Sequence, residues 1–270
     1  MSIPARSQPL VISVLAIVTA AAACHHNAPP IRFAPDGTDI DRLRAEYALS
    51  ETERQSLTPE TLRRFTQPQL DQIYMRLSTG PMPDGPFRGD LFVPRGGAKP
   101  GHVGDIAPNL PAKLSAAASM PIEQLGRAFW KGKVFFKSDG ILRNRIEDVL
   151  ILKPFIKDSA SIPKLTFDGQ TTWLLFPAKT SCGPSKLDPA RHAIVIDYSK
   201  GSEVTGYRDI PDSLAGPDAL DILDEVRIVR PGLYLGRAHF RGQFRLNFTL
   251  LKPDVSSVGS TDVTGDCTIG

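Results

Sequence analysis

The stretch LYLGRAHFRGQFRLNFTLL, residues 233–251, carries the clearest fold signal in the chain. In its second half, apolar and polar residues alternate, as in Phe244-Arg245-Leu246-Asn247. Successive side chains of a β-strand point to opposite faces, so a period of two predicts a strand with one apolar and one polar face. Arg241-Gly242, between the two halves, is typical of a tight hairpin turn. The stretch therefore predicts two antiparallel strands, at Leu233–Phe240 and Gln243–Leu251.

Further strand-like segments precede this hairpin and are joined to one another by short connections. Asp168-Gly169 and Pro231-Gly232 are turn sequences. About eight antiparallel strands with short connections favour a small β-barrel, because closure leaves no exposed sheet edge. We assign a β-barrel domain to residues 126–251 and a C-terminal tail to residues 252–270. The additional segments are Arg127–Lys137, Ile141–Ile146, Lys164–Asp168, Thr171–Phe176, His192–Tyr198 and Asp224–Arg230.

Residues 38–125 have a different character and are interpreted as a helical and Pro/Gly-rich extension. Ser50 with Glu53 forms a capping-box pattern, and Pro59 after Thr58 suits the first turn of a helix. We expect helices at 39–49, from 50, from 58 and at 67–77, then a linker or entry loop at 80–104 and a small helix at 112–125. In the helix at 67–77, helical spacing predicts one buried stripe of Leu70, Ile73, Tyr74 and Leu77.

The N-terminus resembles a bacterial lipoprotein signal. Arg6 precedes an apolar run from Leu10 to Val18, and Ala21-Ala22-Ala23-Cys24 follows as a lipobox. The apolar run is about half the roughly 20 residues that a transmembrane helix needs, so the segment is interpreted as a removable signal at 1–23. The resemblance implies lipidation of Cys24, a membrane partner and an address on the periplasmic side of the cell envelope. The following residues are polar and contain Pro, so 24–37 is interpreted as a tether. Ordinary cleavage after Ala23, without lipidation, stays open.

Charge and cysteine content restrict the remaining possibilities. The 270-residue chain has a formal net charge of +3 with scattered Lys and Arg, so a nucleic-acid partner is not expected. If Cys24 is acylated, Cys182 and Cys267 are the remaining thiols, and an exported compartment favours a disulfide between them. The alternative makes Cys182 a catalytic thiolate, which needs a group beside it that lowers its pKa.

A second resemblance is carried by five short segments. It is to uncharacterised bacterial proteins named for a G-x-W-x-G motif, and it implies a lipocalin-like β-barrel with no established reaction. The tryptophan that names the motif is missing from residues 87–92, so no ligand contact is carried over from it. The segments are LDQIY at 70–74, PFRGDL at 86–91, FWKGKVF at 129–135, IVIDY at 194–198 and LGR at 235–237.

Catalytic signatures are missing from the sequence, which contains no G-x-S-x-G, H-E-x-x-H, G-x-G-x-x-G or P-loop. We therefore expect no metal site and no cofactor, and we interpret the acidic group Asp221, Asp224 and Glu225 as making surface ion pairs. Aromatic residues are expected to line an apolar pocket or the core, and polar residues to anchor a ligand inside the barrel or face solvent. The candidate ligand-binding residues are Trp130, Trp173, His192, Arg237, His239, Arg245 and Asn247.

Three functions are compatible with these features. The first is an envelope lipoprotein that binds a hydrophobic small molecule or lipid in its barrel. The second is a cell-envelope hydrolase that uses His192 or His239 with an acidic partner such as Asp188. The third is a structural or assembly factor whose helical region, residues 39–77, forms a docking surface.

Overall fold

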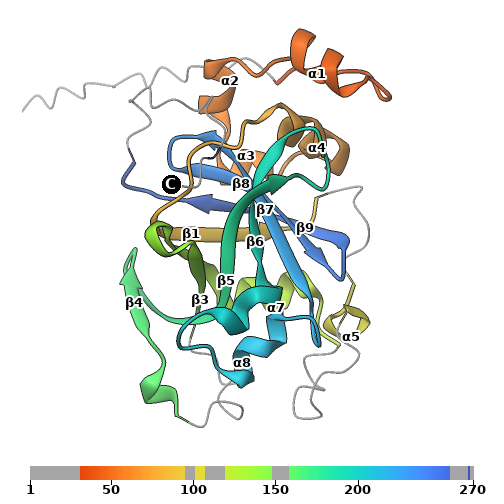
Figure 1. Cartoon of the computed structure of the whole chain (residues 1–270). Coiled ribbons are helices and arrows are strands. Elements are labelled where there is room, and N and C mark those ends of the chain that lie inside the picture. Colours follow the sequence, from red (N-terminus) through yellow and green to blue (C-terminus); the bar gives the residue numbers. More distant parts are fainter. Residues whose placement is uncertain (1–30, 95–100, 107–118, 148–157, 256–266, 268–270) are drawn as a thin grey trace, which may run out of the picture.

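The computed structural model describes residues 31–94, 101–106, 119–147, 158–255 and 267. Eight antiparallel strands form a closed barrel, which confirms the predicted fold class (Figure 1). The order β3-β2-β1-β9-β8-β7-β6-β5 is closed by pairing of β3 with β5. The barrel strands are β1 Gly85–Phe92, β2 Trp130–Phe136, β3 Ile141–Ile146, β5 Gln170–Pro184, β6 His192–Asp197, β7 Ile222–Arg230, β8 Leu233–Phe240 and β9 Gln243–Leu251.

The hairpin turns form where the sequence predicts them. Asp168 and Gly169 both have positive φ, as do Arg241 and Gly242, a backbone conformation that a two-residue hairpin requires and that glycine adopts readily. The first of these turns joins β4, Lys164–Phe167, to β5. Within the described residues, β4 pairs with β5 alone and extends the sheet beyond the closed barrel.

Two expectations about the middle of the chain are wrong. The predicted linker at 80–104 contains β1, which pairs with β2 and β9, so the barrel begins before residue 126. The strand expected from Arg127 begins at Trp130, because helix α7, Ile122–Phe129, occupies the preceding residues. Much of the helix expected at 112–125 lies outside the described residues.

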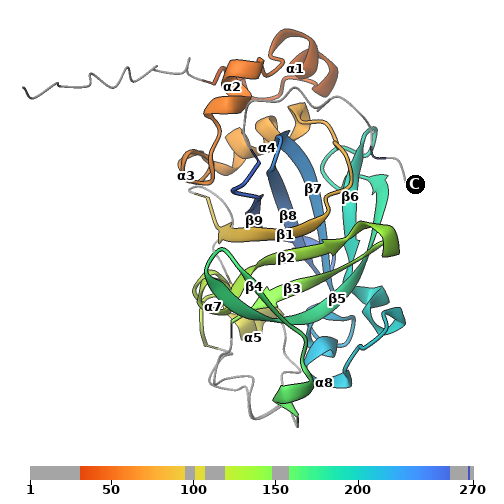
Figure 2. The same ribbon diagram turned by 90° about the vertical axis from the view of Figure 1, so that its left-hand side faces the viewer.

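The N-terminal helices pack on the outside of the barrel (Figures 1 and 2). They are α1 Ile40–Glu46, α2 Glu51–Ser56, α3 Pro59–Leu62 and α4 Gln67–Arg76. The predicted capping box at Ser50 and Glu53 is present, and Pro59 stands in the first turn of α3. Side chains from these helices form one hydrophobic cluster with Phe92, Val229, Leu233 and Leu235 of the strands. The predicted stripe Leu70, Ile73, Tyr74 and Leu77 is fully buried in this cluster.

Shorter elements lie at the other end of the barrel, where α5, α7 and α8 are grouped in both views (Figures 1 and 2). Val103, Ile122 and Ala215 from this end belong to the same hydrophobic core as the barrel interior. The described helices include none long and apolar enough to cross a membrane. The short elements at this end are α5 Val103–Ile106, α8 Asp209–Asp212 and the 3₁₀ segments Ser159–Ser161, Tyr198–Glu203 and Ser213–Ala215. The 3₁₀ segment Lys137–Asp139 follows β2 at the opposite end, where the Lys137 N–H donates to Asp84 Oδ1 at 3.2 Å.

The expected disulfide between Cys182 and Cys267 is present and links β5 to the C-terminal region. Cys182 therefore has no free thiol, so the alternative of a catalytic thiolate at this position is wrong. The two cysteines are 85 residues apart in the sequence. A cross-link over such a span restricts the unfolded chain.

Loss of this disulfide is expected to lower the free energy of unfolding by about 4.6 kcal/mol in the chain-entropy model. The comparison is between the oxidised protein and the double variant Cys182→Ser, Cys267→Ser, each unfolded in urea. The single variants serve as controls, because each removes the cross-link while changing one residue. Equal unfolding free energies for the oxidised protein and the double variant would show that the cross-link does not stabilise the fold.

Candidate functional site

The barrel interior is mostly apolar but contains one ion pair. Along β7, Val226 and Ile228 belong to the hydrophobic core, and Asp224 shares their face of the strand because side chains alternate. Along β2, Lys133 shares the face of Phe135 in the same way. Lys133 Nζ lies 2.9 Å from Asp224 Oδ2, and their side chains are only 2% and 6% exposed. The expectation of a surface ion pair at Asp224 is therefore wrong.

This ion pair crosses the barrel. On one side of the strand order, β1, β9 and β8 lie between β2 and β7, and on the other side β3, β5 and β6 lie between them. Two further residues complete the cluster. Lys133 Nζ donates to Asn144 Oδ1 at 3.0 Å and to Tyr198 Oη at 2.5 Å. The four residues link opposite walls of the barrel through one set of hydrogen bonds.

Aromatic rings surround the Lys133 ammonium. Its Nζ is 5.2–5.4 Å from the ring centroids of Trp130, Tyr198 and Phe248, within the range of cation–π attraction. Two of these rings occupy space left by glycines. A Cβ at Gly89 would collide with the Trp130 ring, and one at Gly236 would collide with the Phe248 ring. Trp130 also donates through Nε1 to Asn144 Oδ1 at 2.8 Å.

Protonation in this cluster is set by burial and by the ion pair. Burial by itself lowers the pKa of Lys133, but the Asp224 carboxylate and the Tyr198 hydroxyl outweigh it, so the pKa is raised. Burial raises the pKa of Tyr198 to about 12. Lys133 is thus an ammonium and Tyr198 a neutral phenol at neutral pH, and neither is suited to act as a general base. The arrangement suits hydrogen bonding better than proton abstraction.

One polar atom of the cluster has no partner. Asp224 Oδ1 is buried and makes no hydrogen bond, whereas Oδ2 accepts from Lys133 and from Tyr198, the latter at 3.4 Å. A buried carboxylate oxygen without a donor is costly. Asp224 Oδ1 therefore marks a position at which a donor from another molecule would be stabilised.

The structure separates the two candidate tryptophans from most of the candidate polar residues. Trp130 belongs to the interior cluster. Trp173 is buried in a smaller hydrophobic cluster with Ile146, Ile162 and Leu175, which Trp130 and Phe176 also contact. Within the part of the chain that the structure describes, Trp130 is the one candidate ligand-binding residue that contacts the Lys133 ion pair.

Arg237, His239 and Asn247 lie on the outer face of the barrel, so of the two expected positions the one in the interior is wrong. Arg237 forms an ion pair with Asp71 of α4, and Asn247 Nδ2 donates to Gln67 Oε1 at 2.9 Å. All three outward side chains are nevertheless buried, and α4 covers Arg237 and Asn247 through Asp71 and Gln67. Polar outward positions, which on an uncovered sheet would face solvent, here meet a helix.

A β-bulge between Ala238 and His239 changes the register next to this region. It pairs Phe244 with His239, and the two rings meet edge to face with centroids 5.9 Å apart. The Arg237 guanidinium lies 4.2 Å from the Phe244 ring centroid. Phe244 therefore packs on the outer face, although strict alternation with Leu246 predicts an inward position.

The last two candidate residues contribute little through their side chains. Arg245 is half-buried and donates to Gln243 Oε1 at 2.6 Å. The His192 side chain is exposed, but its backbone carbonyl accepts from Thr79 Oγ1 at 2.8 Å and from Arg227 Nε at 3.1 Å. His192 thus takes part in the structure through its main chain.

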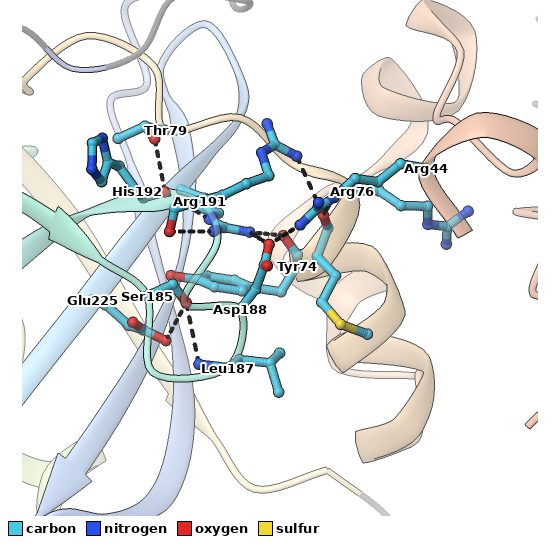
Figure 3. Close-up of polar contacts among 12 residues, drawn as sticks. Arg44, Tyr74, Arg76, Thr79, Ser185, Leu187, Asp188, Arg191, His192 and Glu225 are labelled. Atoms are coloured by element: carbon cyan, nitrogen blue, oxygen red, sulfur yellow. Dashed lines mark hydrogen bonds and ion pairs between the residues drawn. The ribbon is translucent and has the colours of Figure 1, made fainter. Parts of the chain in front are cut away.

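A second polar network lies outside the barrel, where α4 and the loop after β5 meet β7 (Figure 3). The fully buried Arg227 pairs with Asp188 at 3.3 Å and donates to the Tyr74 carbonyl at 3.2 Å. Asp188 therefore pairs with Arg227 and not with His192. Ser185 Oγ donates to Glu225 Oε1 at 3.2 Å. Removing one partner would leave a buried charge unpaired, which is strongly destabilising. The network therefore stabilises the packing of α4 and the loop after β5 against β7.

The interior cluster was missed at the level of sequence, although a signal for it exists. Lys133 stands two residues before Phe135, and Asp224 stands two residues before Val226, each on the apolar face of its strand. Such a charged residue predicts a buried partner. The described residues contain no group of three or more His, Cys, Asp or Glu side chains placed to hold a metal ion.

Comparison with known proteins adds little. No family model matches the chain, and no curated protein matches it. A crystal structure of a protein from Thermomonospora curvata is similar with 16% sequence identity and a TM-score of 0.37, over 72% of this chain and 91% of that chain. No conclusion about function follows from a similarity of this size. The fold and the site define a closed antiparallel β-barrel with a lysine–aspartate pair in its interior.

The pH dependence of stability is expected to report the burial of His239. Burial lowers the pKa of His239 to about 4, and Arg237 adds to the effect. Above pH ~6.5 the imidazole is neutral in both the folded and unfolded states, so it makes no pH-dependent contribution. Between that pH and about 4 the unfolded chain binds a proton that the folded protein does not. Stability should therefore fall as the pH is lowered.

His239→Phe removes this titration while it keeps a ring next to Phe244. The free energy of unfolding of the wild type, measured in urea between pH 7 and pH 4, should fall more steeply than that of the variant. The difference between the two proteins is the relevant quantity, because the titration of other groups is common to both. A constant difference over this range would contradict the assignment of a buried neutral imidazole.

Proposed function

We propose that the protein is a cell-envelope lipoprotein whose β-barrel binds a hydrophobic small molecule or lipid. The observation that carries the proposal is the Lys133–Asp224 pair in an otherwise apolar interior, with the unpartnered Asp224 Oδ1. An eight-stranded barrel has an interior that side chains fill or that holds one small ligand. Ligand sites of this kind are mostly apolar with few polar groups that fix orientation.

Energetics support a role for this pair other than stability. Removing two charges from water costs several kcal/mol per ion, and a buried ion pair is often no more stable than apolar residues of similar volume. The cluster leaves one oxygen without a donor, which adds to the cost. Buried titratable groups whose pKa is shifted by burial and by a specific charged partner are concentrated at functional sites. The proposal gives the pair the role of orienting a bound molecule.

The sequence supports the location. The resemblance of residues 1–24 to a lipoprotein signal, with Cys24 as the acylated residue, implies a membrane partner on the periplasmic side. These residues lie outside the part of the chain that the structure describes. A lipid anchor would place the barrel close to a supply of apolar molecules.

The alternative functions find less support in the geometry. Among the described interactions, no hydrogen bond or ion pair joins His192 or His239 to a carboxylate, as a hydrolase would require. The apolar sides of the helices at 39–77 are buried against the barrel, so those surfaces are not available to a partner. Deletion of residues 39–77 would also expose this face of the barrel.

The ligand-binding proposal is tested with the full chain carrying Cys24→Ala, exported to a bacterial periplasm so that it is released without acylation. Native mass spectrometry and solvent extraction should identify an apolar passenger at about one per chain. Lys133→Gln with Asp224→Asn removes both interior charges together and should lower passenger occupancy by roughly tenfold or more, since hydrogen bonds to charged groups contribute about 1.5–3 kcal/mol.

The matched control is Arg88→Gln with Asp168→Asn, which removes an ion pair with exposed side chains. This variant should keep the passenger. The proposal would be contradicted if the folded wild-type protein carries nothing and if added apolar probes neither bind nor shift its unfolding temperature.

The anchor is tested by fractionation of cells that express the unaltered chain or the Cys24→Ala variant. The unaltered protein should be recovered with membranes and should incorporate labelled palmitate, and the variant should be recovered in the soluble periplasmic fraction. His25→Ala, next to the acylation position, serves as the control and should stay with the membranes. Recovery of the unaltered protein in the soluble fraction without label would instead favour ordinary cleavage after Ala23.

A further inference from the structure

The hydrogen bonds of the interior cluster restrict which head group a ligand can present. An ammonium carries three N–H donors. Those of Lys133 are matched by three acceptors, Asn144 Oδ1 at 3.0 Å, Tyr198 Oη at 2.5 Å and Asp224 Oδ2 at 2.9 Å. A carboxylate or phosphate that enters the barrel would therefore have to displace one of these acceptors in order to bind Lys133.

The unpartnered atom of the cluster has the opposite requirement. Asp224 is 4% exposed, and its Oδ1 is buried without a hydrogen bond. A carboxylate oxygen only accepts, so it needs a donor. The neighbours of Asp224 in the sheet are Ile196 on β6 and Ala238 on β8, and neither side chain carries a donor. A donor from a bound molecule would complete the hydrogen bonding of the carboxylate.

Charge acts in the same direction. The Lys133 ammonium is already paired with the Asp224 carboxylate, so the cluster as a whole is close to neutral. A second anion beside Asp224 would meet a like charge where little water screens it. A hydroxyl would meet a free acceptor there and would add no charge. A ligand ammonium would be repelled by Lys133, but the Asp224 carboxylate and the aromatic rings of Trp130 and Phe248 would attract it.

We propose that the bound molecule is a single-chain amphiphile whose head group is a hydrogen-bond donor, either a hydroxyl or an ammonium, bound to Asp224 Oδ1. Its apolar chain lies among the core side chains, and amphiphiles with a carboxylate or phosphate head are selected against. This assignment rests on the proposed function, because it names the ligand class of the same site.

The test measures binding of three probes of equal chain length, dodecanol, dodecylamine and dodecanoate. Each is titrated into the full chain carrying Cys24→Ala by isothermal calorimetry at pH 7, below the solubility limit of dodecanol and below the micelle concentrations of the two charged probes. Dodecanol and dodecylamine are expected to bind about tenfold to a hundredfold more tightly than dodecanoate, the range for one hydrogen bond to a charged group. Lys133→Gln with Asp224→Asn should abolish this preference, and Arg88→Gln with Asp168→Asn should retain it.

The outcomes separate the two proposals. Equal or tighter binding of dodecanoate would overturn the head-group assignment and leave the binding function in place. An unchanged preference in the Lys133→Gln, Asp224→Asn protein would also overturn it, because the selective site would then lie elsewhere. Failure of all three probes to bind would overturn both proposals. If that double variant does not fold, the order of the three affinities in the wild-type protein alone decides.

Discussion

The structure depends on strand β8, which is buried on both faces. Its inward side chains, such as Tyr234 and Phe240, pack in the barrel interior, and its outward Leu233 and Leu235 pack against the N-terminal helices. A strand of an antiparallel sheet commonly has one solvated face. Here the outer face carries apolar residues that have to be covered, and the helices cover them. Helices and barrel therefore share one hydrophobic structure, and polar residues on the outer face of β8 are buried with it.

The barrel wall is buried on its inner face by the core and on its outer face by the helices. Each of these two faces carries one buried polar network, and the two networks differ in geometry. The outer network joins β7 to α4 and to the loop after β5 through Arg227, Asp188 and Glu225, and its charges have several partners. This network therefore has a structural role, because it connects a helix and a loop to the barrel. The interior cluster joins β2 to β7 across the barrel and keeps one acceptor without a partner. Asp188 Oδ1 of the outer network is also buried without a hydrogen bond, so an unpartnered carboxylate oxygen is present in both networks. The interior cluster differs from the outer network in its place, because it lies between opposite walls of the barrel.

Sequence patterns predicted the elements of the barrel well where short-range rules decide. The turn at Arg241-Gly242 and the strand at Ile141–Ile146 follow from backbone conformation and alternation, and both are confirmed. The strand Gly85–Phe92 was missed because its Gly and Pro residues are typical of a loop, whereas pairing with β2 and β9 makes it a strand. The side on which Arg237 and His239 lie relative to α4 depends on tertiary packing. Alternation predicts that they share a face, but it does not predict which face a helix covers.

The residues inside the barrel include charges that packing alone does not require, which supports the proposed binding role. If the interior were selected for packing alone, apolar side chains at positions 133 and 224 would avoid the desolvation of two charges. Gly89 and Gly236 leave room for Trp130 and Phe248, whose rings lie next to the ammonium of Lys133. The interior therefore holds a charged group with aromatic neighbours and one acceptor without a partner, a composition compatible with the proposed small-molecule site.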